Sequence, residues 1–463
     1  MTSEELFYQK KPAFGRVDSE KVQQYAEGYK AFLDRGKTER DAVTTIVNIA
    51  HEAGFVPYKR GMLLNPGDRI YCVNREKAVA LAVIGAESLD NGIALTAAHL
   101  DAPRIDIRTV PLYEQDGMAF FKTHYYGGIK KYQWTAIPLE LRGVVCVCRN
   151  GKMLKFRVNI GADPSDPKFV ITDLLPHLAS KQMEQKMTDG IKAENMNILI
   201  ASKPSETEDE TCGEKDKIKL AVMEYLHQKY GMTEIDFLSA ELSCVPAFNA
   251  CDVGFDRSMV GAYGHDDRVC AYPAATSLIA LEGTPRRTAV CLLVDKEEIG
   301  SEGVTGMQSR FFDTFMADLC RAQGVYPEVC YEHSTCLSTD VCNAFDPNYA
   351  DVSEARNDAR INCGFALMKY SGARGKSGTS DATAELMAQI RLILENAGVP
   401  WQTAQLGRVD QGGGGTVAMY LANRNIDTVD AGVPVLSMHS PFEVISKLDL
   451  YCAFLGMGAF YQA

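Results

Sequence analysis

The change of hydrophobic pattern along the chain constrains the fold more than any other feature. Apolar residues recur at helical spacing in 19–35 and 38–55, and two continuous apolar runs, 77–85 and 92–101, follow them. Short apolar runs beside helices are typical of strands that are buried on both faces. From 104 to 251 the segments are short and alternate between apolar and polar residues, which predicts antiparallel strands.

After residue 251, the sequence pattern again predicts strands that alternate with helices. Apolar runs at 287–295 and 429–440 read as buried strands, and 380–398 has a helical pattern. Ser380 is the predicted N-cap of that helix, and Gly398 is its predicted stop. The simplest architecture is therefore an α/β domain made from both ends of the chain, with a β-rich domain inserted. The predicted boundaries are 1–103 and 252–463 for the first domain and 104–251 for the second.

Composition narrows the class of protein. The 463 residues carry 48 basic and 60 acidic side chains, a formal charge of −12, which disfavours nucleic acid as a partner. The chain has no apolar run of 18 residues and no secretory pattern at its start, so we expect a cytoplasmic protein without a membrane partner. The fourteen cysteines include no C-x-x-C pair and are expected to be reduced and buried. The acidic stretch 206–217 is expected to be an exposed loop.

Three apolar runs end in groups that can bind a metal or move a proton. The run 92–101 ends in His99 and Asp101, Glu297 and Glu298 follow the next run, and His439 closes the last. In open α/β sheets, ligands bind beyond the carboxyl ends of the strands, so we expect these side chains to meet.

Two loop acids, Asp266 and Asp340, are candidates for the same site. Imidazole with carboxylate and no thiolate is a ligand set for catalytic zinc, manganese or cobalt. Two metals that share one carboxylate need about five protein ligands, a number that this chain can supply. No local H-E-x-x-H motif occurs, so the spacing alone is only moderately specific.

Five motifs, in their order along the chain, resemble those of one metallopeptidase family. They are HLDAP, YGHDDRV, DKEEIGSEG, LSTDVCN and LSMHSPFE, and they span nearly the whole chain. They are similar to the M18 metallo-aminopeptidases, the aspartyl aminopeptidase or aminopeptidase I family. YYGGIKKYQW and GGGGTVA also resemble its bacterial branch. The resemblance implies an α/β, dinuclear-metallopeptidase catalytic domain with an inserted β-rich oligomerisation domain.

The resemblance also implies a site for two divalent metal ions, with zinc expected first and cobalt or manganese as alternatives. Asp266 would bridge the two ions. His99 and Asp340 would complete one site, and Glu298 and His439 would complete the other.

The same resemblance implies roles in hydrolysis of the first peptide bond of a peptide with a free N-terminus. Glu297 would be the general base, which requires a carboxylate that is not used as a ligand. Asp101 would orient His99, because a ligating histidine usually donates its other N–H to a carboxylate. His177 matches a family histidine that reaches the active site of a neighbouring subunit and steadies the oxyanion.

Four positions bear on the choice of substrate. Lys369 matches a pocket lysine of the family, and Lys376 falls near a family tyrosine. Ala102 replaces the usual serine, and Asn343 stands where eukaryotic-type relatives carry histidine. These departures leave both acidic and neutral N-terminal residues open as substrates.

Several alternatives remain open from the sequence. One is a related deacylase or carboxypeptidase with the same metal pair, and another is an assembly or cargo protein with a vestigial site. The glycine run 412–415 lacks a P-loop lysine and is expected to let the backbone pass close to the metal site. His265 and Asp267 are expected to orient Asp266, with direct ligation as the alternative.

The insertion is expected to drive assembly. An antiparallel β-domain can pair its edges across a two-fold axis. The resemblance implies a homo-oligomer in which dimers build a tetrahedral dodecamer.

Overall fold

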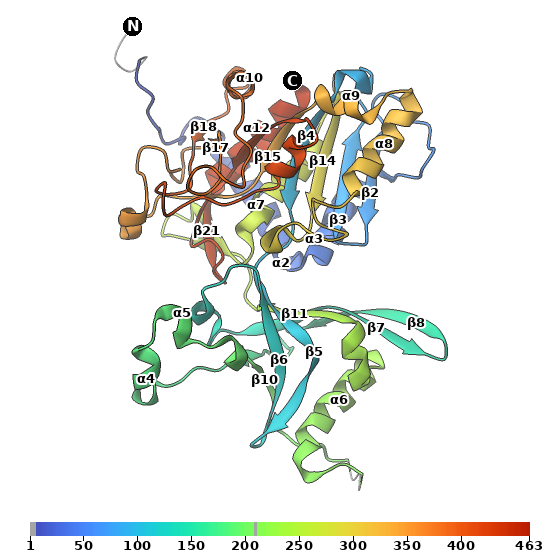
Figure 1. The fold of residues 1–463 in the computed structure, drawn as a ribbon, viewed down its shortest axis with the longest axis vertical. Coiled ribbons are helices and arrows are strands. Elements are labelled where there is room, and N and C mark those ends of the chain that lie inside the picture. The colour runs from blue at the N-terminus through green and yellow to red at the C-terminus, as the bar shows by residue number, and fades with distance from the viewer. Residues whose placement is uncertain (1–5, 208–210) are drawn as a thin grey trace. The chain divides into compact units, whose positions relative to one another are not determined.

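The computed structural model describes residues 6–207 and 211–463, which form two compact units (Figure 1). The first unit holds the described residues up to Ala102, together with Asn249–Met438 and Phe442–Ala463. The second holds Pro103–Phe248 and His439–Pro441. No helix in the described part of the chain has the length and apolar character that crossing a membrane requires.

A nine-stranded mixed sheet is the centre of the first unit. In spatial order its strands are β1 (Val56–Pro57), β2 (Arg69–Asn74), β3 (Ala78–Val83), β14 (Thr288–Val294), β4 (Ile93–His99), β15 (Thr335–Thr339), β19 (Asp427–Gly432), β17 (Phe365–Met368) and β18 (Trp401–Thr403). The four central strands β14, β4, β15 and β19 run parallel, so their carboxyl ends meet at one edge of the sheet.

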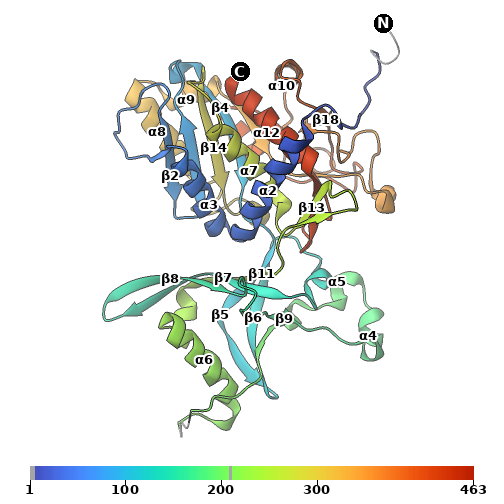
Figure 2. The same cartoon turned by 180° about the vertical axis from the view of Figure 1, so that it is seen from behind.

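Helices cover both faces of this sheet, which explains why its central strands are apolar throughout (Figures 1 and 2). One face packs on α2 (Ser19–Arg35), α3 (Glu39–Glu52), α7 (His265–Ile279), α10 (Ala384–Asn396) and α12 (Lys447–Gln462). The other packs on α8 (Phe311–Gln323), α9 (Pro327–Glu332) and α11 (Ala418–Ala422). Leu81 of β3 points into the first core and Ala80 into the second. The predicted α/β class is confirmed.

A second sheet in this unit has five short strands. In spatial order they are β12 (Cys251–Val253), β13 (Met259–Ala262), β21 (Glu443–Ser446), β20 (Pro434–Leu436) and β16 (Cys342–Asn343). The chain passes from the large sheet to the small one at Asp340, between β15 and β16, and again at Val433, between β19 and β20. At this crossing a β-carbon on Gly432 would overlap the carbonyl oxygen of Asp340. The predicted single strand at 429–440 is therefore wrong, because its residues divide between two sheets.

The second unit is built on a seven-stranded antiparallel sheet, as the alternating pattern predicted. Its order is β8 (Lys152–Ile160), β7 (Leu139–Arg149), β11 (Ala240–Pro246), β5 (Arg104–Gln115), β6 (Met118–Tyr126), β10 (Ile198–Ala201) and β9 (Val170–Ile171). Its helices are α4 (Ser180–Met183), α5 (Met187–Gly190) and α6 (Lys217–Tyr230).

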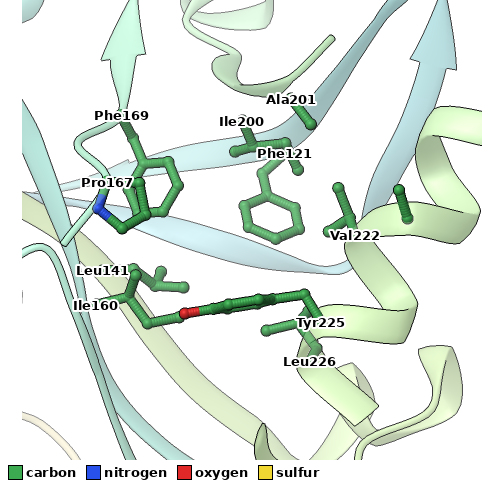
Figure 3. Close-up of a pocket in the computed structure, with 11 residues that line it drawn as sticks. Phe121, Leu141, Ile160, Pro167, Phe169, Ile200, Ala201, Val222, Tyr225 and Leu226 are labelled. Atoms are coloured by element: carbon green, nitrogen blue, oxygen red, sulfur yellow. The ribbon is translucent and has the colours of Figure 1, made fainter. Parts of the chain in front are cut away.

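An apolar cavity of about 230 Å³ lies between α6 and the sheet of the second unit. Figure 3 shows Phe121, Phe169 and Tyr225 among the side chains that line it. Apart from the Tyr225 hydroxyl, its described lining offers no acid, base or thiol, so the cavity is a packing surface and not a catalytic site.

Two of the predicted helices are confirmed, and the start of a third was predicted wrongly. The helices predicted at 19–35 and 38–55 are confirmed as α2 and α3, and Asp18 caps α2 by accepting from two backbone N–H groups. Ser380 was the wrong N-cap, because α10 begins after Thr383, whose hydroxyl accepts from Leu386 N at 3.2 Å.

All fourteen cysteines are free thiols. Nine of them are buried as predicted, but Cys148 and Cys251 are exposed. Residues 208–210 of the predicted acidic loop lie outside the described part of the chain, and Glu206, Thr207 and Thr211 beside them are exposed.

Candidate metal centre

His99 is the last residue of β4, and its ring is almost completely buried. The ring Nδ1 lies 3.0 Å from the carbonyl oxygen of Asp101 and 3.3 Å from its Oδ1. Because a carbonyl only accepts, Nδ1 carries the proton, and in the neutral ring Nε2 carries the lone pair. Nε2 lies 3.1 Å from Asp266 Oδ1 and 3.8 Å from Asp340 Oδ1. The histidine therefore presents a ligand nitrogen to two carboxylates.

The Asp101 carboxylate also holds the turn that carries Glu297 and Glu298. Glu297 and Glu298 begin the short helix η7 (Glu297–Ile299). Asp295 and Lys296 separate this helix from the end of β14, and Lys296 has a left-handed backbone conformation. Glu297 N donates to Asp101 Oδ1 at 3.1 Å, and Glu298 N donates to Oδ2 at 3.2 Å. One buried carboxylate thus holds both the imidazole of His99 and the turn that carries the two glutamates.

Two overlapping groups of side chains have ligand geometry. In each group the ligand atoms lie within 4.8 Å of one another: His99, Asp267 and Asp340 in one, His99, Asp266 and Glu298 in the other. Ligands bound at about 2.0–2.1 Å to a tetrahedral ion are roughly 3.3 Å apart, which lies between the two distances from His99 Nε2. Imidazole with carboxylates is also the donor set of catalytic zinc.

The start of α7 supplies the two aspartates. Asp266 has non-helical backbone angles there, and its N–H donates to Glu443 Oε2 at 3.1 Å. Asp267 Oδ2 accepts from His99 N at 3.4 Å. Its Oδ1 is buried and has no hydrogen-bond partner among the described residues. A buried, unpaired carboxylate oxygen is costly, so this atom fits a bound cation.

The electrostatics of the cluster also favour cations. Burial lowers the pKa of His99, but hydrogen bonds to Asp101, Asp266 and Asp340 outweigh burial and hold the pKa well above its usual range. Burial and the neighbouring acids raise the pKa of Glu297 to about 8. Burial and then Asp340 raise the pKa of Asp267 well above its usual range. Several largely buried acids share this site, so they tend to retain protons where no metal balances their charge.

Sequence reasoning named most of this cluster, and the contacts of four further predicted residues can be described within their own units. His439 belongs to the second unit, where its Nδ1 donates to the carbonyl of Gly128 at 2.8 Å. His177 is exposed on the second unit. The Nζ atoms of Lys369 and Lys376 bind the carboxylate of Asp381, at 2.5 and 2.8 Å, so each lysine already has an acid partner.

Both ring nitrogens of His265 have partners in the protein, which disfavours direct metal ligation by this histidine. Its Nε2 donates to the Val260 carbonyl at 3.1 Å, and its Nδ1 accepts from the Tyr29 hydroxyl at 2.8 Å, so both nitrogens are used. Burial lowers its pKa to about 3, so the ring is neutral.

The glycine run also differs from expectation. A β-carbon on Gly412 would overlap the Leu406 carbonyl, and one on Gly413 would overlap Ala373. The backbone of this glycine run therefore passes close to the segments around Leu406 and Ala373. The prediction had expected it to pass close to the metal site.

Two buried acids were missed by sequence reasoning. Glu443 accepts from the backbone of Asp266, and its only signal was an acid at the end of LSMHSPFE. Asp430 on β19 accepts from the Thr416 hydroxyl at 2.7 Å, and burial raises its pKa to about 7. An acid inside an otherwise apolar strand was the signal for Asp430.

Known proteins resemble this chain over nearly its whole length. The family model described as "Aminopeptidase I zinc metalloprotease (M18)" matches residues 32–461. A probable M18 family aminopeptidase 1 of Borreliella afzelii is 44% identical over 445 residues, which is 95% of each chain.

Solved structures agree with this match. The M18 aminopeptidase of Thermotoga maritima has a TM-score of 0.93 at 40% identity, covering 98% of this chain and 100% of its own. The mApe1 dodecamer of S. cerevisiae shares the fold, with a TM-score of 0.75 at 18% identity, covering 94% and 96%. The chain therefore belongs to the M18 family of zinc aminopeptidases and is a peptide hydrolase.

Proposed function

We propose that the chain holds two divalent ions and removes the N-terminal residue of peptides. In this proposal Asp266 bridges the ions, His99 and Asp340 complete one site, and Glu298 and His439 complete the other. The ligand geometry around His99 supports the first site. For His439 the support is its tautomer, because an Nδ1 that donates to a carbonyl leaves the lone pair on Nε2.

Bound ions would polarise the scissile carbonyl and acidify a water. The proton transfers and the positioning of the groups would be carried out by side chains of the protein. Glu297 lies 4.0 Å from His99 Nε2, and we propose that it takes the water proton and passes it to the leaving amine. Asp101 keeps Glu297 at that distance by accepting from its backbone N–H.

One observation carries this proposal: a single imidazole nitrogen faces two buried carboxylates while a third, Asp101, holds its other nitrogen. Metal analysis of the purified protein tests it. Two zinc, cobalt or manganese equivalents per chain, both lost on dialysis against a chelator and both needed for activity, are expected. A fully active protein with one equivalent or none would refute the dinuclear site. The family assignment favours this activity over a deacylase, a carboxypeptidase or a non-catalytic assembly protein.

For the substrate we propose acidic or neutral N-terminal residues. Two lysines and Asp381 leave one net positive charge at this cluster, which suits an acidic side chain without requiring it. A panel of aminoacyl substrates with acidic, neutral and basic side chains tests this. Preference for a basic residue would contradict it.

For assembly we propose a homo-oligomer in which dimers build a tetrahedral dodecamer and His177 serves a neighbouring active site. The exposure of His177 and the described dodecamer of the yeast relative support this proposal. Light scattering combined with activity tests it, since a fully active monomer would exclude a shared histidine. The expected cytoplasmic location stays a prediction.

A further inference from the structure

A groove lies between α8, α9 and α11 on one face of the first unit. The groove has a volume of about 740 Å³, with Gln308 and Tyr420 among its lining residues and Glu328 on α9. A neighbouring hollow of about 620 Å³ shares Gln308 and Arg310 with it. The two hollows together are large enough for several residues of a peptide.

The groove meets the turn that carries the proposed general base. Gly300 directly follows η7, and its carbonyl accepts from Gln308 Nε2 at 3.0 Å and from the Tyr420 hydroxyl at 3.4 Å. The pKa of Tyr420 is raised by burial and then by the charges of Glu297 and Glu302, which agrees with this closeness. Two lining residues are thus in direct contact with the catalytic turn.

The two arginines that line the groove differ in how tightly they pair with Asp313. Arg424 is held by Asp313 through two nitrogens, Nε at 2.6 Å and Nη2 at 3.2 Å. Arg310 reaches the same carboxylate only at 3.5 Å, and its side chain is 90% exposed. Arg310 is therefore the cation that the groove presents most openly to a ligand.

We propose that this groove binds the part of a peptide substrate downstream of the scissile bond, with Arg310 pairing to a carboxylate in that part. The inference rests on the proposed aminopeptidase function and adds a binding site to it. From Arg310 to Ala317, α8 rises roughly 10 Å, which equals about three residues of extended peptide. Short peptides would offer their C-terminal carboxylate, and longer ones an acidic side chain.

The test measures the ratio of two kcat/KM values. One is for a tetrapeptide with a free C-terminus, and the other is for an aminoacyl p-nitroanilide of the same first residue. Arg310→Ala is expected to lower this ratio about fivefold, mainly by raising KM for the tetrapeptide, as the loss of one exposed ion pair allows. Arg310→Glu should lower it further. Arg321→Ala is the matched control, because Arg321 is 75% exposed on α8 and pairs with an acid three residues away, at 3.0 Å.

An amidated tetrapeptide without acidic side chains separates charge pairing from a general loss. With this peptide the effect of Arg310→Ala on the ratio should disappear. An equal loss for the charged and the neutral peptide, or no loss for either, would overturn the proposal while leaving the aminopeptidase function intact. If the wild-type protein hydrolysed none of these substrates, the function itself would fail and the groove proposal with it.

Discussion

Asp101→Asn tests whether one buried carboxylate couples the proposed metal ligand His99 to the turn that carries the proposed general base. The side chain of Asp101 is fully buried, and its two oxygens accept from Glu297 N and Glu298 N. An amide has one oxygen, so its NH₂ group must face one of these two donors. A buried N–H without an acceptor costs about 1–3 kcal/mol, and 1.36 kcal/mol is a factor of ten. The unpaired N–H belongs to Glu297 or Glu298, so relieving this cost displaces the turn that carries the proposed general base. If the cost appears in the transition state, kcat/KM at saturating zinc should fall about ten- to hundredfold.

Metal affinity should fall as well. Loss of the partner that orients a ligating histidine typically weakens metal binding about 10- to 100-fold. Zinc titration monitored by activity, together with competition against a chelator of known affinity, measures this change.

Asp449→Asn is the matched control for Asp101→Asn. Asp449 is also fully buried and accepts from two backbone N–H groups, those of Asn362 and Gly364, at 2.7 and 2.6 Å. It should keep the zinc affinity of the wild type, and its urea titration measures the effect of one buried amide on folding stability alone. If Asp101→Asn retained wild-type zinc affinity, or lost no more than Asp449→Asn, the coupling through Asp101 would be wrong.

Three further predictions concern other groups. Glu297→Gln should lower kcat at least about hundredfold with unchanged zinc content, because a general base contributes about 10²–10⁴; full turnover would refute its role. The pKa of Asp430, about 7 in the fold, is above its value of about 3.9 in an unfolded chain, so its charge destabilises the fold. The free energy of unfolding should thus fall by up to about 4 kcal/mol between roughly pH 4 and 7, and Asp430→Asn should flatten that slope in urea titrations. Removing zinc with a chelator should lower the melting temperature, since at a thousandfold excess over Kd each ion adds about 4 kcal/mol; calorimetry with and without zinc checks this.

The sequence predicted those parts of the fold and site that local patterns determine. The apolar run before His99 became β4 because both of its faces are buried, and the parallel neighbours of β4 brought Glu297 and Asp340 to the same edge. The strand-end positions of His99 and Glu297 were thus readable before the structure.

Contacts between distant segments were not readable. The helix predicted from Ser380 starts later, because Thr383 is the residue that caps α10. Asp381, between these two positions, binds two lysines, which no local pattern indicated. The apolar run at 429–440 gave no sign that β19 would end at Gly432, since periodicity does not report which sheet a strand joins. Glu443 was overlooked for the same reason, because its partner lies 177 positions earlier in the chain.

The close contact between Gly432 and the backbone of Asp340 makes a residue without a side chain important for the proposed metal site. Any larger residue at 432 would push against the backbone that aims the Asp340 carboxylate. In a saturation scan scored by turnover, position 432 should therefore show a tolerance profile like that of a ligand, although nothing at 432 touches metal or peptide. Engineers who wish to retune this enzyme should leave position 432 unchanged.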